Sequence, residues 1–127
     1  MYGVFINDDS FPYTDKILKH IKTIETRTKN MLLPLVGERV AIIRTGKGKK
    51  PLVVGYVDIT NYAFCPVIML DAYRNETCIP VGSMFDNLGK RNGRQGKWFY
   101  YLENAVSCNP YKLPSSAIYH GRSWCEF

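Results

Sequence analysis

Three charged side chains that could act together chemically lie within six residues of the sequence. Lys22, Glu25 and Arg27 occur in the stretch KTIETR, which follows a short amphipathic segment. Alternate side chains of an extended strand point to the same face, so Glu25 and Arg27 would share one. In a cleft, the three residues would combine a charge-stabilised carboxylate with cations that contact phosphate. On a solvated strand the same charges would contribute only about 0–1 kcal/mol per pair, and the pattern alone leaves both interpretations open.

Two glycine-rich stretches carry positive charge without any acidic residue. RTGKGKK (44–50) contains Lys47, Lys49 and Lys50, and GKRNGRQGK occupies 89–97. The chain has 17 basic and 11 acidic residues, which gives a formal net charge of +6. Exposed basic loops attract phosphate groups, so nucleic acid is a candidate partner. The alternative is that these charges serve only solubility.

Other catalytic and metal-binding patterns find no support. The four cysteines, at 65, 78, 108 and 125, form no CxxC pair and are accompanied by only two histidines, so buried thiols are expected rather than a metal site. His120 precedes a glycine, where it is either an idle exposed histidine or a general base. The sequence has no GxSxG nucleophile elbow, and GKGKK lacks the strand-to-helix context of a phosphate-binding loop. We expect neither a metal nor a cofactor.

Aromatic residues make up 13% of the chain and gather in one segment. In WFYY (98–101), alternation would set Trp98 and Tyr100 on one strand face and Phe99 and Tyr101 on the other. One face must pack into the core. The other could stack against a nucleic-acid base, an interaction worth about 1–3 kcal/mol per base. The alternative is that most of these rings belong to the core or to a half-buried sheet surface, with one or two lining a pocket.

The elements that must position these residues follow from apolar spacing and turn residues. Thr14 and Asp15 form an N-cap and an acidic first turn, which predicts a helix that ends near Lys22. Pro66 precedes a second predicted helix at 67–75, and 81–89 could form a further helical turn. The β-branched and aromatic runs predict extended segments at 3–6, 22–28, 38–46, 51–64, 97–106 and 121–127. A basic hairpin turn at 46–50 joins two of these segments, and Gly55 predicts a bulge or a tight bend.

These elements describe one domain over residues 1–127. About five or six strands with short helices predict a mainly β protein of the α+β class, built as a small, partly open β-barrel. An α+β sandwich with helices on one face is the alternative. No apolar run is long enough to span a membrane, and the acidic N-terminal stretch is unlike a signal peptide. We therefore expect a soluble, cytoplasmic protein, whose oligomeric state the sequence leaves open.

Several short motifs, taken in order, resemble an ASCH domain, a branch of the PUA-like β-barrels. Lys22, Ile24, Glu25 and Arg27 match the first motif, Lys-(Thr)-Ile-Glu-x-Arg. The segment 36–43 then resembles the family's GERVAI strand, and 54–59 resembles its next strand, xVGxVxI. Near the C-terminus, WFYYLEN and GRSW resemble the closing strands. The likeness covers most of the chain, and residues 66–96 align least well.

The resemblance implies a cleft beside the first helix that binds RNA or a nucleotide-like ligand. Lys22 and Arg27 would contact phosphate or a base edge, and Glu25 would orient them or accept a hydrogen bond. Arg122 and Trp124, in the closing segment, would reach the same cleft. The loop residues Lys47, Lys49 and Lys50 would supply non-specific attraction. A protein–protein adaptor is a third function class, which has no need of the basic loops.

The resemblance also implies an enzymatic alternative on the same cleft. Some small ASCH proteins resemble amidohydrolases that deacetylate 4-acetylcytidine with a Lys, a Thr and a later Glu, and others are reported as single-strand ribonucleases. Here Lys22 matches the lysine, Glu25 stands at the threonine position, and Thr26 is displaced by one residue. In the enzymatic interpretation Lys22 and Glu25 would be the catalytic pair. Whether the protein is an enzyme is open at this level.

The sequence leads to one expectation about Glu25 itself. If Glu25 faces a ligand, Glu25→Gln should weaken ligand binding far more than it lowers stability. Equal losses of binding and of thermal stability would argue against a site there.

Overall fold

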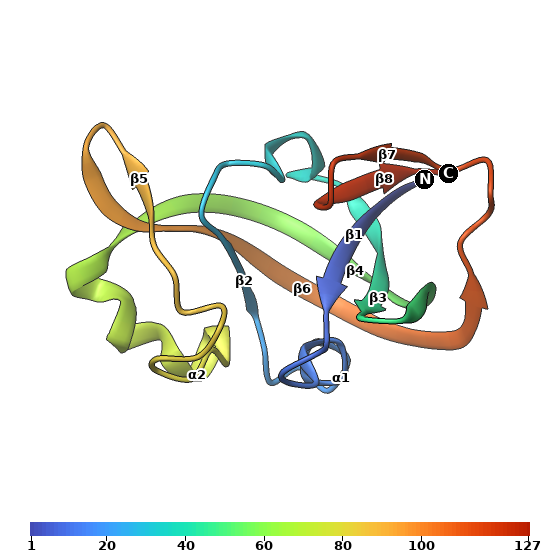
Figure 1. Cartoon of the computed structure of the whole chain (residues 1–127), viewed down its shortest axis with the longest axis horizontal. Helices are drawn as coiled ribbons and strands as arrows, with labels where there is room; N and C mark the ends of the chain where they lie inside the picture. Colours follow the sequence, from blue (N-terminus) through green and yellow to red (C-terminus); the bar gives the residue numbers. More distant parts are fainter.

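The computed structural model describes residues 1–127 and consists mainly of β-strands. The elements, in chain order, are β1 (Tyr2–Asn7), α1 (Tyr13–Leu18), β2 (Ile24–Arg27), the 3-10 helix η1 (Leu33–Leu35), β3 (Arg39–Gly46), β4 (Lys49–Pro66), the 3-10 helix η2 (Val67–Tyr73), α2 (Arg74–Thr77), β5 (Gly89–Arg91), β6 (Arg94–Lys112), β7 (Ile118–His120) and β8 (Trp124–Glu126). Figure 1 shows the long β4 and β6 crossing the molecule, with the short helices near one side and the two termini together. The predicted α+β class is confirmed.

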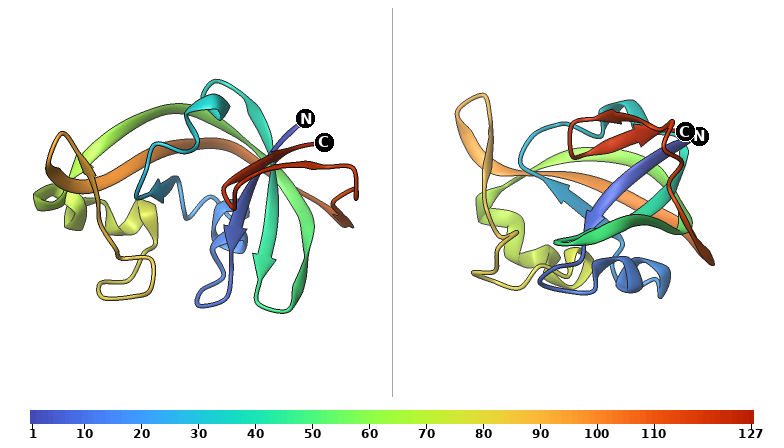
Figure 2. Two further views of the ribbon diagram at one scale, coloured as in Figure 1. Left: turned by 45° about the horizontal axis from the view of Figure 1, so that its top comes forward. Right: turned by 45° about the vertical axis from the view of Figure 1, so that its right-hand side comes forward.

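All eight strands belong to one sheet. The order is β2-β6-β4-β3-β1-β8-β7, with β5 paired to β6. The β1–β3 pair is parallel and the other pairs are antiparallel. The order has two ends, β2 and β7, and no hydrogen-bonded pair joins them. The sheet is therefore open, although β4 and β6 arch strongly (Figure 2).

The predicted count of five or six strands is wrong, because the sheet has eight. The two strands that were not predicted, β5 and β7, have only three residues each, whereas β8 lies within the predicted segment 121–127. Such short strands carry too few side chains for an alternating pattern, and they are defined by their hydrogen-bonded neighbours.

The predicted hairpin and the predicted bulge are both present. β3 and β4 pair across the 46–50 turn, and their register shifts where Ile42 is opposite Gly55 and Ile43 is opposite Val53. A Cβ atom on Gly55 would lie 2.4 Å from the Val106 carbonyl oxygen. Glycine is therefore needed here because another backbone approaches closely.

The helices are shorter than predicted. α1 ends at Leu18 rather than near Lys22, and His20 adopts a left-handed φ of 61°. Thr14 lies inside the helix and hydrogen-bonds Asp8, so it is not the N-cap; Pro12 occupies that position. The segment predicted as one helix at 67–75 is η2 followed by α2, and 81–89 forms turns without a helix.

The core lies on both faces of β6. Tyr100 belongs to the largest apolar cluster, which includes α1 and the inner sides of β1, β3 and β4. Phe99 packs on the opposite face with Ile24, Cys65 and Leu70. Both rings are buried, so WFYY contributes to the core on both strand faces, as the core interpretation of these rings predicted. Trp98 and Tyr101 are half-buried.

No helix of the structure has the length and apolar character that crossing a membrane would require.

Candidate functional site

A cavity lies beside β2, which is an end strand of the sheet and has only β6 as a neighbour. The cavity volume is about 440 Å³. Its walls come from β1, α1, β2 and the segment before β5, with contributions from the segment between β7 and β8. The lining residues that carry the argument below are Tyr13, Lys22, Glu25, Thr26, Arg27, Thr28, Phe85, Asn87, Lys97 and Arg122.

Lys22 is buried, with only 2% of its surface exposed. Its Nζ donates to the backbone oxygens of Ile24 (2.8 Å) and Thr77 (2.6 Å), and lies 3.4 Å from Glu25 Oε1. The left-handed residue His20 ends α1 early and turns the chain so that this side chain points inward. Burial lowers the pKa of Lys22, and the nearby Glu25 carboxylate partly opposes that shift. All three ammonium hydrogens thus have protein acceptors.

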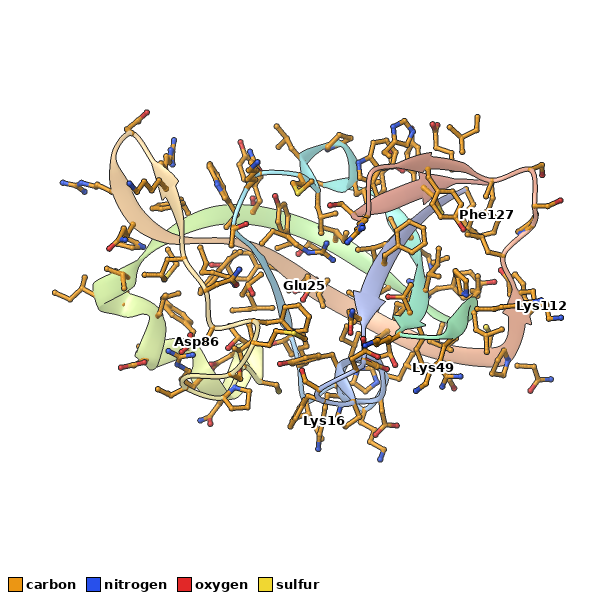
Figure 3. All side chains as sticks on the ribbon, in the orientation of Figure 1. Lys16, Glu25, Lys49, Asp86, Lys112 and Phe127 are labelled. Atoms are coloured by element: carbon orange, nitrogen blue, oxygen red, sulfur yellow. The ribbon has the colours of Figure 1, made fainter.

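Glu25 lies between two cations. Oε1 faces Lys22 and accepts the Thr26 amide hydrogen at 3.2 Å, while Oε2 accepts from Arg27 Nη2 at 2.9 Å. Burial raises the pKa of Glu25, but the charges and hydrogen bonds of Lys22 and Arg27 outweigh it and the net shift is downward. Glu25 is therefore ionised at neutral pH. Figure 3 shows it near the middle of the molecule.

Arg27 joins this ion cluster to β1. Its Nη2 donates to the Phe5 carbonyl oxygen at 2.7 Å as well as to Glu25. Its Nε and Nη1 have no hydrogen-bond partner in the protein, and 17% of the side chain is exposed. Arg27 is the member of the cluster with donors left for a ligand.

Lys97 also lines the cavity, although the sequence pattern placed it at the end of an exposed basic loop. It is buried, and its Nζ donates to the Phe85 carbonyl oxygen (2.8 Å) and to Asn87 Oδ1 (3.2 Å). Burial lowers its pKa to about 8, with Glu25 opposing the shift. The only sequence signal was that Lys97 directly precedes the apolar WFYY run. A lysine next to a buried strand can itself be buried.

Tyr13 was another residue that sequence reasoning missed. Its ring lies on the cavity wall, 5.2 Å from Lys22 Nζ to the ring centroid. The buried hydroxyl groups of Tyr13 and Ser83 each lack a hydrogen-bond partner of normal geometry. Burial raises the pKa of Tyr13, and the charge of Glu25 raises it further. A polar ligand in the cavity could satisfy such a hydroxyl.

The cavity is positively charged overall. Four cationic side chains (Lys22, Arg27, Lys97 and Arg122) line it together with one carboxylate, Glu25. One cation is neutralised by Glu25, so three positive charges remain. Anionic ligands are favoured in such a cavity.

Comparison with known proteins rests on structure. No known family profile matches the sequence, and no curated protein matches it. A crystal structure of ASCH from Zymomonas mobilis superposes with a TM-score of 0.67 and 20% identity, over 87% of this chain and 73% of that one. Crystal structures of two single-substitution variants of that protein give TM-scores of 0.65 and 0.64 at the same 20% identity and 87% coverage of this chain, over 74% and 76% of theirs.

This chain has the ASCH fold. The resemblance seen in the sequence motifs is thereby supported at the level of structure. In this example of the ASCH fold, the KTIETR motif contributes one wall of the cavity.

The remaining candidate residues divide between the cavity and the outer surface. Arg122 lines the cavity and is exposed. Trp124 does not line it, because its ring packs edge-on against Tyr2 and stacks on His120 at 3.8 Å. His120 also lies 2.8 Å from Glu126, outside the cavity.

The three loop lysines are exposed at the β3–β4 turn and do not line the cavity: Lys47, Lys49 and Lys50. The four cysteines form no disulfide, and Cys65 and Cys125 are buried. No group of three or more His, Cys, Asp or Glu side chains is arranged to hold a metal ion.

Proposed function

We propose that the cavity beside β2 binds a nucleotide unit, either of RNA or of a free nucleotide-like ligand. The observation that carries this proposal is the ionised Glu25, held between Lys22 and Arg27 on the wall of a cavity with three uncompensated positive charges. Its volume of about 440 Å³ falls within the usual range of small-molecule sites. The ASCH fold is compatible with RNA binding.

Each side chain of the cluster has a distinct role in this proposal. Arg27 offers Nε and Nη1 to a phosphate, and Glu25 accepts a hydrogen bond from a base. Lys22 is a positioning residue, because its three ammonium hydrogens already contact acceptors in the protein. Arg122 adds a cation at the exposed rim of the cavity.

Lys47, Lys49 and Lys50 act at longer range in this proposal. Their charges lie outside the cavity and attract a polyanion without contacting the bound nucleotide. Trp124 does not contact the ligand in this proposal, since its ring is already stacked on His120.

Arg122→Ala tests the proposal with little risk to the fold. We expect the affinity for cytidine 5′-monophosphate to fall about 3- to 10-fold, because one solvent-screened charge contact to phosphate is lost. Isothermal titration calorimetry measures the affinity, and a thermal melt should show an unchanged Tm. Lys47→Ala is the matched control, since it removes an exposed cation outside the cavity. The proposed function is wrong if neither cytidine 5′-monophosphate nor a single-stranded RNA octamer binds the unmodified protein.

Nucleotide affinity should also depend on pH through Lys97. Its pKa of about 8 means that the amine is protonated at pH 7 and largely neutral at pH 9. A cation lost from the cavity wall weakens binding of an anion, so affinity should decrease as pH rises from 7 to 9. Titrations at both values measure the effect. In Lys97→Arg, which remains charged throughout this range, the decrease should disappear; a decrease of equal size would contradict this role for Lys97.

A hydrolase is the second candidate function, and a specific observation favours it. The cavity contains an amine with a pKa of about 8 and, in Tyr13, a buried hydroxyl without a normal hydrogen bond. The amine is suited to proton transfer near neutral pH. The Tyr13 hydroxyl keeps its proton, because its pKa is raised, and is suited to donating a hydrogen bond to a developing oxyanion. The pair inferred from sequence is less suited, because two cations lower the proton affinity of Glu25 and Lys22 donates all its hydrogens.

Incubation with 4-acetylcytidine and with single-stranded RNA separates the two functions. Chromatography would detect cytidine or RNA fragments. Turnover that is lost in Tyr13→Phe would support the hydrolase. Binding of the same ligands without turnover would contradict it and leave the binding function.

A further inference from the structure

A group of aromatic side chains, one exposed and two half-buried, lies next to the cavity but outside it. Trp98 packs edge-on against Phe64, with ring centroids 5.3 Å apart, and Tyr62 lies 6.3 Å from Trp98 with its ring tilted by 32°. The Arg91 guanidinium lies over the Trp98 ring, 5.3 Å from the centroid. Tyr62 is 40% exposed, and Phe64 and Trp98 are half-buried. We call these four residues the aromatic platform.

The strand register places the aromatic platform beside the ion cluster. Arg27 of β2 is opposite Trp98 of β6, and Trp98 is opposite Phe64 of β4. Directly opposed residues of antiparallel strands point to the same face. Arg27, Trp98 and Phe64 therefore form one row across three strands, about 10 Å long at the usual strand spacing.

The β5–β6 hairpin borders both the cavity and the aromatic platform. Gly89, at its base, lies so close to the Thr28 carbonyl that an added Cβ would be 1.8 Å from the oxygen, and Thr28 lines the cavity. Lys90, Arg91 and Arg94 are exposed on the hairpin, and none forms an ion pair with an acidic side chain. Figure 2 shows the hairpin projecting from the end of β4 and β6.

We infer that the aromatic platform stacks the bases of single-stranded RNA whose neighbouring nucleotide occupies the cavity. Proteins hold single strands without reading sequence by stacking bases on accessible aromatic rings beside a track of cations, and Tyr62 is such an exposed ring here. The three hairpin cations have no acidic neighbour, which favours a polyanion over a protein partner. This inference rests on the proposed function, which gives a nucleotide unit as the ligand. It adds that the ligand is an RNA strand rather than a free nucleotide.

The row geometry explains how one strand would reach both sites. The Arg91 guanidinium covers one side of the Trp98 ring. The base that follows a nucleotide bound at Arg27 therefore stacks on the exposed Tyr62 ring, about two strand spacings away. Tyr62 lies one row further along β4, opposite Tyr100. Arg91 holds the phosphate between the stacked bases, since it is exposed and has no carboxylate partner.

The test compares a single nucleotide with a strand in a matched pair of double variants. Tyr62→Ala combined with Arg91→Ala removes one exposed ring and one cation while leaving the half-buried Trp98 in place. Tyr111→Ala combined with Lys112→Ala likewise removes one exposed ring and one positive charge, thirteen residues beyond Trp98 on β6. Tyr111 is 38% exposed, close to the 40% of Tyr62, and Lys112 lies at the other end of the molecule from the hairpin (Figure 3).

The ligands are cytidine 5′-monophosphate and a single-stranded RNA octamer labelled with a fluorophore. In the Tyr62/Arg91 variant, octamer affinity should fall about 5- to 150-fold, the range expected for the loss of one stacked base. Affinity for the mononucleotide should not change, and the Tyr111/Lys112 variant should bind both ligands like the unmodified protein.

Three results would overturn or reassign the inference. Equal octamer affinity in the Tyr62/Arg91 variant and the unmodified protein overturns the aromatic platform while the cavity proposal stands. An equal loss in the two double variants also overturns it, because the effect is then one of net charge. If the octamer binds, the Tyr62/Arg91 variant weakens it and Arg122→Ala does not, the platform is supported and the cavity assignment fails.

Discussion

Replacing Glu25 by glutamine is expected to lower the free energy of unfolding by about 3–5 kcal/mol, the usual cost of removing one partner from a buried ion pair. Lys22 would remain buried with no carboxylate beside it, since its other two contacts are backbone oxygens. Urea unfolding at neutral pH measures the change. Asp15→Asn is the control, because the Asp15–Lys19 pair is exposed and its loss should cost no more than about 1 kcal/mol.

A double-mutant cycle identifies the cause of that loss. Lys22→Met and Glu25→Gln together remove both charges, and the double variant should be less destabilised than the two single changes added together. Strict additivity would show that Lys22 and Glu25 are not coupled. A loss below about 1 kcal/mol for Glu25→Gln alone would mean that the carboxylate is effectively solvated.

This expected loss changes how Glu25 can be tested for ligand binding. From the sequence, Glu25→Gln should affect binding far more than stability. The structure adds a large stability cost of its own, because the Glu25 carboxylate is the counter-charge of a buried ammonium group. To measure an effect on ligand binding separately from an effect on stability, a variant must keep the Lys22–Glu25 ion pair.

Arg27→Lys is such a variant, and it should lower the affinity for cytidine 5′-monophosphate about 10- to 100-fold. Lysine keeps a positive charge beside Glu25, so the ion cluster remains paired. It loses the planar fork of donors, including the Nε and Nη1 groups that have no protein partner. Isothermal titration calorimetry measures the affinity, and urea unfolding should show a much smaller change than for Glu25→Gln.

The matched control for Arg27 is Arg39→Lys. Arg39 pairs with Asp58 through Nη1 at 2.8 Å on the surface of β3 and β4, so the same substitution is made outside the cavity. Its nucleotide affinity should not change. If Arg27→Lys also binds normally while Arg122→Ala binds weakly, the phosphate lies at the cavity rim, and the role proposed for Arg27 is wrong.

Local patterns in the sequence predicted the elements that depend on near neighbours. The β3–β4 hairpin and the bulge at Gly55 follow from β-branched runs, a glycine-rich turn and one glycine in a strand, and the structure has both. The early end of α1 was missed, because it depends on the left-handed conformation of His20. The three-residue strands β5 and β7 were also missed, since they exist through pairing with other segments.

The candidate site shows the same division. The KTIETR spacing identified Lys22, Glu25 and Arg27, which the structure brings into direct contact. Lys97 and Tyr13 reach the cavity from β6 and α1, and no short-range pattern relates either of them to Glu25. Trp124 follows the closing motif but turns toward Tyr2 and His120 instead.

By itself the sequence determined the α+β class, the resemblance to ASCH proteins and the identity of three charged candidate site residues. Each of these depends on the types of residues that are only a few positions apart. Whether those charges were solvated or buried was decided only by the tertiary structure. Burial depends on what covers a side chain, and Lys22 is covered by segments that include Thr77, 55 positions away. The same distant contacts turn Lys22 from a candidate phosphate ligand into the cation that holds Glu25 in place.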